Sequence, residues 1–174
     1  MKVYKNISGL EFVVIDKLPN RQVLVRFLGT GSVVKADGRN LSAGKVADPF
    51  HKSRLGIGYM GNFSKTAFHK QAYQLWSNML KRCYDENDAR GYFGTGVGVD
   101  PRWHSFENFV NDLPHLSSFN GWKSGEGYDL DKDFRGDGKT YSRETCCFLP
   151  RSVNRAAGKG GKTLLGGVWV TTKL

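Results

Sequence analysis

The chain has 174 residues, 39% hydrophobic and 13% aromatic, which is enough to bury one ordinary core or two small ones. Its formal net charge of +10 exceeds what solubility requires and indicates a polyanionic partner. We find no apolar run of about 18 residues and no signal-peptide core. We therefore expect no membrane partner and predict a cytoplasmic protein.

The N-terminal third is rich in strand-forming residues. β-branched and aromatic side chains dominate residues 10–16 and 22–28, a third short stretch covers 32–36, and residues 41–46 offer another strand. This pattern predicts a small antiparallel β domain of SH3-like size over residues 1–48.

The next segment, residues 49–66, mixes glycine, basic and aromatic residues without a helical period, so we expect an extended basic linker. One interpretation is a solvated spacer. The other is an arm along a DNA groove, in which Lys52, Arg54 and Lys65 contact phosphates.

Two helices are predicted next. Residues 67–83 place apolar side chains at three- and four-residue steps, as at Ala72, Trp76 and Leu80, with Lys81 and Arg82 on the other sides. A Gly-rich connection with a short strand at 97–99 follows, and Ser105 can cap a helix over 106–113. Residues 116–128 have the composition of a loop.

Residues 128–154 predict a strand, a Gly-containing turn, a second strand and a short helix opened by Pro150. The fold class is therefore α+β, with a ββα domain over residues 67–158 and a basic tail over 159–174. The three cysteines are odd in number and two are adjacent, which favours reduced thiols over disulfides or a zinc site.

Several short motifs resemble phage-encoded HNH-type (His-Me finger) homing endonucleases. They are LWSNMLKRCY at 75–84, WHSFENF at 103–109, LDKD at 130–133, YSRETC at 141–146, and FLP with VN at 148–150 and 153–154. The resemblance covers nearly half of the chain and implies an HNH-like ββα domain. It also implies a C-terminal AP2-like DNA-binding domain, of which residues 165–170 resemble only the opening strand.

The resemblance implies a metal site with a histidine base, and this chain departs from it. Asp131 stands at one metal-ligand position and Asn154 at the helix ligand, but Lys132 stands where the histidine would be, and Thr145 replaces a polar Asn. At an exposed strand end a lysine is a cation without a lone pair, and losing a general base costs about 10² to 10⁴ in rate.

Two interpretations remain. In the favoured one, the chain is a nuclease-dead, sequence-specific double-stranded DNA-binding protein that represses phage or satellite genes in a bacterial host, without cofactor. Its expected phosphate contacts are Lys52, Arg54, Lys65, Lys81, Arg82, Lys132, Lys139, Arg143, Arg151 and Arg155. In the alternative it is an active Mg²⁺-dependent endonuclease in which Asp131, Asp133 and Asn154 hold the metal and His104 is the base. The sequence leaves open whether the protein forms a homodimer.

Overall fold

Four strands near the N-terminus form one antiparallel sheet in chain order, in a computed structural model that describes residues 2–136, 138–157, 162–165 and 168–171. The strands are β1 (Val3–Lys5), β2 (Glu11–Leu18), β3 (Gln22–Phe27) and β4 (Val33–Asp37). Alternation along β3 directs Val23, Val25 and Phe27 into a small core, where they meet Phe12 and Val46. The expected antiparallel β unit is confirmed.

The possible strand at residues 41–46 is wrong. A short helix, α1 (Gly38–Ser42), ends within this stretch instead. It forms because the Asp37 side chain accepts a hydrogen bond from the backbone N–H of Arg39 at 2.8 Å and caps the first turn. After α1 the side chain of Val46 joins the small core, and the Asn6 side chain donates to the carbonyl of Val46 at 2.9 Å.

The predicted linker is only partly extended, because its second half packs on the rest of the chain. Tyr59 pairs with Ser105 in an isolated parallel bridge, and Phe63 meets Phe106 edge-on at 4.9 Å. Gly58 is buried against Trp76, and a side chain there would come within 2.8 Å of its ring. Close backbone approach at this glycine explains why the segment is fixed.

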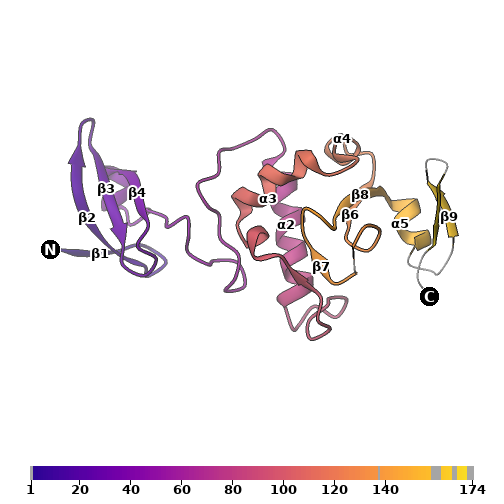
Figure 1. Ribbon diagram of the computed structural model, residues 1–174. Coiled ribbons are helices and arrows are strands. Elements are labelled where there is room, and N and C mark those ends of the chain that lie inside the picture. The colour runs from indigo at the N-terminus through magenta and orange to yellow at the C-terminus, as the bar shows by residue number, and fades with distance from the viewer. Residues whose placement is uncertain (1, 137, 158–161, 166–167, 172–174) are drawn as a thin grey trace.

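The larger unit, here called the central body, is built around the helix α2 (His69–Tyr84), as Figure 1 shows. Its other elements are β5 (Gly98–Val99), η1 (Pro101–His104), α3 (Phe106–Asp112), η2 (Leu113–His115), α4 (Phe119–Lys123), β6 (Tyr128–Asp131), β7 (Thr140–Tyr141), β8 (Cys147–Pro150) and α5 (Arg151–Ala157). The apolar stripe predicted for α2 is buried and packs against Trp103, Phe106 and Phe109. Ser105 caps α3 as expected, by accepting from the backbone N–H of Asn108 at 3.3 Å.

The loop expected over residues 116–128 contains the helix α4, which is a correction. Ser118 takes a left-handed conformation with φ of 61° and turns the chain into this helix. The helix forms because Trp122 is buried and stacks on Phe148 with ring centroids 5.0 Å apart.

At the C-terminal end, β9 (Lys162–Leu165) pairs with β10 (Val168–Thr171) as an antiparallel hairpin. The segment that resembles an AP2-like opening strand falls on this hairpin, except for residues 166–167, which lie outside the described residues. No helix in the described part of the chain is long and apolar enough to cross a membrane.

Candidate nucleic-acid interface

Two antiparallel strands and a helix position the residues that the sequence singled out. β6 pairs with β8 so that Asp131 lies opposite Cys147 and Leu130 opposite Phe148, and α5 follows β8 directly. Pro150 is the last residue of β8 rather than the first of the helix. β7, in the connection between the strands, pairs in parallel with β5.

Asp131 holds the turn that follows β6. One carboxylate oxygen, Oδ1, accepts hydrogen bonds from the backbone N–H groups of Asp133 at 3.0 Å and Phe134 at 2.7 Å. Burial raises the pKa of this carboxyl above its usual 3.8, and the neighbouring Asp133 charge adds to the rise, while the bond from Phe134 opposes it. The geometry gives Asp131 a structural role in the turn.

Lys132 is buried, so the expectation that it lies at an exposed strand end is wrong. Its side chain is 4% exposed. The ammonium donates to Asp133 Oδ1 at 2.6 Å and lies 4.7 Å from the Tyr92 ring centroid and 5.6 Å from that of Tyr141. Two aromatic faces and one carboxylate replace the water that a surface lysine would keep.

Tyr92 links this buried lysine to the surface. The Arg82 guanidinium carbon lies 4.6 Å from the same ring centroid, and an Arg82 Nη2 donates to the Tyr92 hydroxyl at 2.7 Å. One tyrosine ring therefore stabilises two cations, of which Arg82 is exposed and Lys132 is buried. The expected phosphate contact at Arg82 keeps its access to solvent.

The side chains predicted as metal ligands have partners within the protein. Asp131 Oδ1 serves two backbone amides and Asp133 Oδ1 serves Lys132, while Asn154 is half-buried on α5. Among the described residues, no group of three or more His, Cys, Asp or Glu side chains could hold a metal ion. Asp131 and Asp133 are thus each engaged within the protein through one carboxylate oxygen.

His104, the candidate base if the protein is an endonuclease, has different neighbours from Asp131. Its Nε2 is 3.1 Å from the Tyr84 hydroxyl, which also accepts from the backbone N–H of Val99 at 3.0 Å. Burial lowers the pKa of His104 below 6.5, and the nearby Lys52 cation contributes to the decrease. The groups around it are thus Tyr84, Val99 and Lys52, whereas Asp131 faces its own turn.

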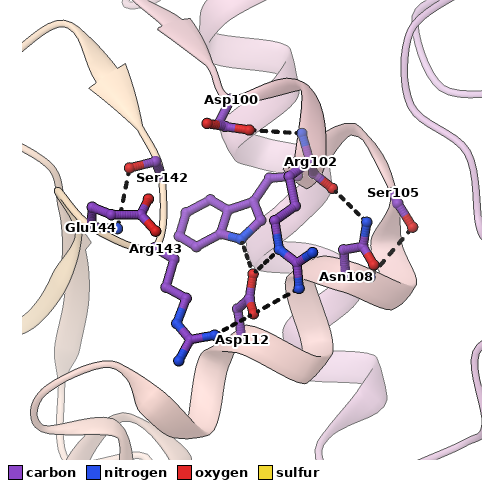
Figure 2. A network of polar contacts seen from close by, with 9 residues as sticks. Asp100, Arg102, Ser105, Asn108, Asp112, Ser142, Arg143 and Glu144 are labelled. Carbon is purple, nitrogen blue, oxygen red and sulfur yellow. Dashed lines mark hydrogen bonds and ion pairs between the residues drawn. The ribbon is translucent and has the colours of Figure 1, made fainter.

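Figure 2 shows a polar network that the sequence did not predict. The buried Asp112 carboxylate accepts from Arg102 Nε at 2.9 Å and from the Trp103 indole N–H at 2.9 Å, and it pairs with Arg143 at 3.4 Å. Arg143, an expected phosphate contact, is therefore partly neutralised within the protein. An acidic residue in the last turn of a helix opposes the helix dipole, and this was the available signal that Asp112 needs a cationic partner.

The remaining expected phosphate contacts differ in their freedom to bind. Arg54 is half-buried, and its Nε is buried without a hydrogen-bond partner, while Arg151 pairs with Asp129 at 3.1 Å. Exposed residues from the expected set include Lys52, Lys65, Lys81, Arg82, Lys139, Arg151 and Arg155.

The excess positive charge is unevenly distributed along the sequence. Residues 1–66 carry eleven Lys and Arg against four Asp and Glu, whereas residues 67–157 carry twelve of each. Residues 158–174 carry three lysines and no acid. The net charge of +10 therefore belongs to the N-terminal sheet, the segment after it and the C-terminal tail, while the central body is neutral overall.

No family model matches the chain, and neither the curated proteins nor the solved structures contain a significant match. Fold and charge define an α+β protein with an N-terminal four-stranded antiparallel sheet and a mostly helical central body.

Proposed function

We propose that the chain is a sequence-specific double-stranded DNA-binding protein on an HNH-like ββα scaffold that no longer cleaves. It acts by occupying its site, as a repressor of phage or satellite genes. The observation that carries the loss of cleavage is Lys132, which stands at the histidine position of the motif and is buried between Tyr92 and Tyr141. A buried ammonium paired with Asp133 has no lone pair for activating water.

The distribution of charge supports binding to a polyanion. The segment 49–66 carries three cations and no acid, and Lys52 and Lys65 are both exposed on it. Together with residues 1–48 it carries eleven Lys and Arg against four Asp and Glu, which leaves a net charge of +7. Such charge supplies most of the affinity of DNA-binding proteins through release of counterions from phosphates.

Salt titration of DNA binding tests the proposal. Fluorescence anisotropy of a labelled 30-base-pair duplex should show binding at low salt, with log K falling linearly with log[salt] at a slope of about −0.9 per phosphate contact. Replacing Lys52 or Lys65 with Ala should each reduce the slope by about 1. Lys5→Ala removes a cation already paired with Glu11 at 3.2 Å and serves as the control.

The absence of a bound species at low salt would overturn the proposal, and so would a slope near zero. If the Lys52 and Lys65 variants kept the full slope while Lys5→Ala reduced it, the phosphate contacts would lie on the sheet edge instead of the linker.

The second candidate function, a Mg²⁺-dependent endonuclease, draws its support from His104. The lowered pKa of this half-buried imidazole keeps it neutral at pH 7, which is the form a general base requires. Incubation with supercoiled plasmid and Mg²⁺ or Mn²⁺ separates the two functions. Nicking that Asp131→Ala abolishes would establish the nuclease, and plasmid that stays intact would contradict it.

A further inference from the structure

The solvent-facing side of α2 has an unusual composition. The helix contains no acidic residue in its 16 positions. Apart from Tyr73, its exposed residues are all amides or cations, namely Lys70, Gln71, Gln74, Asn78, Lys81 and Arg82. Their spacing of three and four places them on one side, opposite the buried stripe that includes Trp76 and Leu80. We call this side the α2 polar face.

The α2 polar face is bordered by two hollows that share Asn78. One, of about 400 Å³, lies along Gln71, Gln74 and Asn78 and is closed by Trp122, Tyr128 and Arg151. The other, of about 440 Å³, lies along Asn78, Lys81 and Arg82 and is closed by the loop that carries Asp88 and Arg90. The helix therefore presents its amides at the middle of a continuous hollowed surface with cations toward both ends.

Two of the amides hold each other in place. Gln74 Nε2 donates to Asn78 Oδ1 at 2.9 Å, one turn apart on the helix. Within the described part of the chain this leaves Gln74 Oε1 as an acceptor and Asn78 Nδ2 as a donor for a ligand. Gln71 is instead committed, because its Nε2 donates to the carbonyl of Trp122 at 2.8 Å.

We infer that the α2 polar face is the surface that reads bases, with Gln74 and Asn78 contacting adenine in the DNA major groove. The inference rests on the proposed DNA binding and names the element responsible for specificity. An acceptor and a donor held side by side match the N6 amino group and N7 of adenine, which together present one donor and one acceptor in that groove. A helix of this length spans about 24 Å, enough to cross a groove about 12 Å wide.

The charges around the face agree with this orientation. Lys70 lies at one end, Lys81 and Arg82 lie at the other, and all three are exposed where the phosphates flanking the groove would pass. Two carboxylates border the hollows as well. Asp129 is paired with Arg151 at 3.1 Å, and Asp88 turns its Oδ1 toward the backbone N–H of Arg90 at 3.2 Å.

The rigidity of the helix supports a reading role. Its buried side packs Trp76 against Phe106 with ring centroids 5.3 Å apart, and the Trp76 indole N–H donates to the carbonyl of Trp103 at 2.8 Å. Base recognition requires side chains held in register on a rigid element, which this packing provides.

The test is selection from a pool of duplex DNA with a randomised centre, followed by sequencing of the bound fraction. The wild-type protein should enrich a motif that contains adenine. The double variant Gln74→Ala with Asn78→Ala should lose preference at the adenine positions by about 5- to 150-fold, while its low-salt binding to the unselected pool stays within a factor of three. Asn111→Ala, an exposed asparagine on α3, is the matched control and should enrich the wild-type motif.

The outcomes separate this inference from the proposed function. If the wild-type protein enriches a motif and the double variant enriches the same motif, the reading role of α2 is overturned and sequence-specific DNA binding stands. If the wild-type protein binds the pool but enriches no motif, the reading role and the sequence specificity of the proposed function both fail, and only non-specific DNA binding stands. If the wild-type protein does not bind the pool at low salt, the proposed function itself fails. Circular dichroism of each variant confirms that the change is not one of folding.

Discussion

Replacing Lys132 distinguishes a buried structural cation from a phosphate contact. In Lys132→Ala the side chain loses three buried methylenes, worth about 0.8 kcal/mol each, so the free energy of unfolding should decrease by about 2.4 kcal/mol, before the two cation–π contacts are counted. Those contacts contribute roughly 0.5–2 kcal/mol each. Lys132→Met keeps most of the stem and should cost about 1–2 kcal/mol, because the Asp133 left behind is 60% exposed and is solvated by water.

Urea unfolding followed by tryptophan fluorescence measures this loss. Three of the four tryptophans, Trp76, Trp103 and Trp122, are buried in the central body, so most of the fluorescence change reports on the unit that contains Lys132. In parallel, DNA affinity of the folded Lys132→Met protein should stay within threefold of wild type. A stable Lys132→Ala protein with tenfold weaker DNA binding would refute the structural role.

Other changes probe the rest of the architecture. Asp112→Asn should lower the free energy of unfolding by about 3 kcal/mol at pH 7. Burial would raise the pKa of Asp112, but the bonds from Arg102 and Trp103 outweigh it and lower the pKa below 3.8. The carboxylate therefore stabilises the fold above about pH 4 and loses this effect as the pH falls through the folded-state pKa, so pH-dependent unfolding of the variant should lack that step. Gly58→Ala should release the docked segment, since the new Cβ would lie 2.5 Å from Leu80 and 2.8 Å from Trp76, and limited proteolysis should then cut it faster. At pH 8, a thiol reagent should label the native protein only slowly and the unfolded protein fully, because burial raises the thiol pKa to about 11, 12 and 11 at Cys83, Cys146 and Cys147.

The helices α2 and α3 could be predicted from the sequence, because apolar periodicity and a capping residue mark them. The three- and four-residue apolar steps located α2 within two residues, and Ser105 marked the start of α3, because periodicity and capping act within one or two turns. The short helix α4 escaped prediction since it is held by the contact of Trp122 with Phe148, 26 positions away.

The candidate site was predicted less well than the fold. Motif spacing located the β6–β8 pair, but it could not show that Lys132 is buried, because the enclosing rings come from Tyr92, forty residues earlier, and from Tyr141 on a different strand pair. A lysine considered by itself is expected at the surface. The fixed position of Gly58 was missed for the same reason, since its neighbours Trp76 and Leu80 lie on α2.

The most direct test of DNA occupancy without cleavage is a footprinting experiment with Mg²⁺ present throughout. The DNA is an end-labelled duplex from the region upstream of the gene that encodes this protein. The account predicts a protected stretch of defined length whose DNA stays full-length in the absence of added nuclease. Protein-dependent cutting within that stretch, or uniform protection without boundaries, would contradict it.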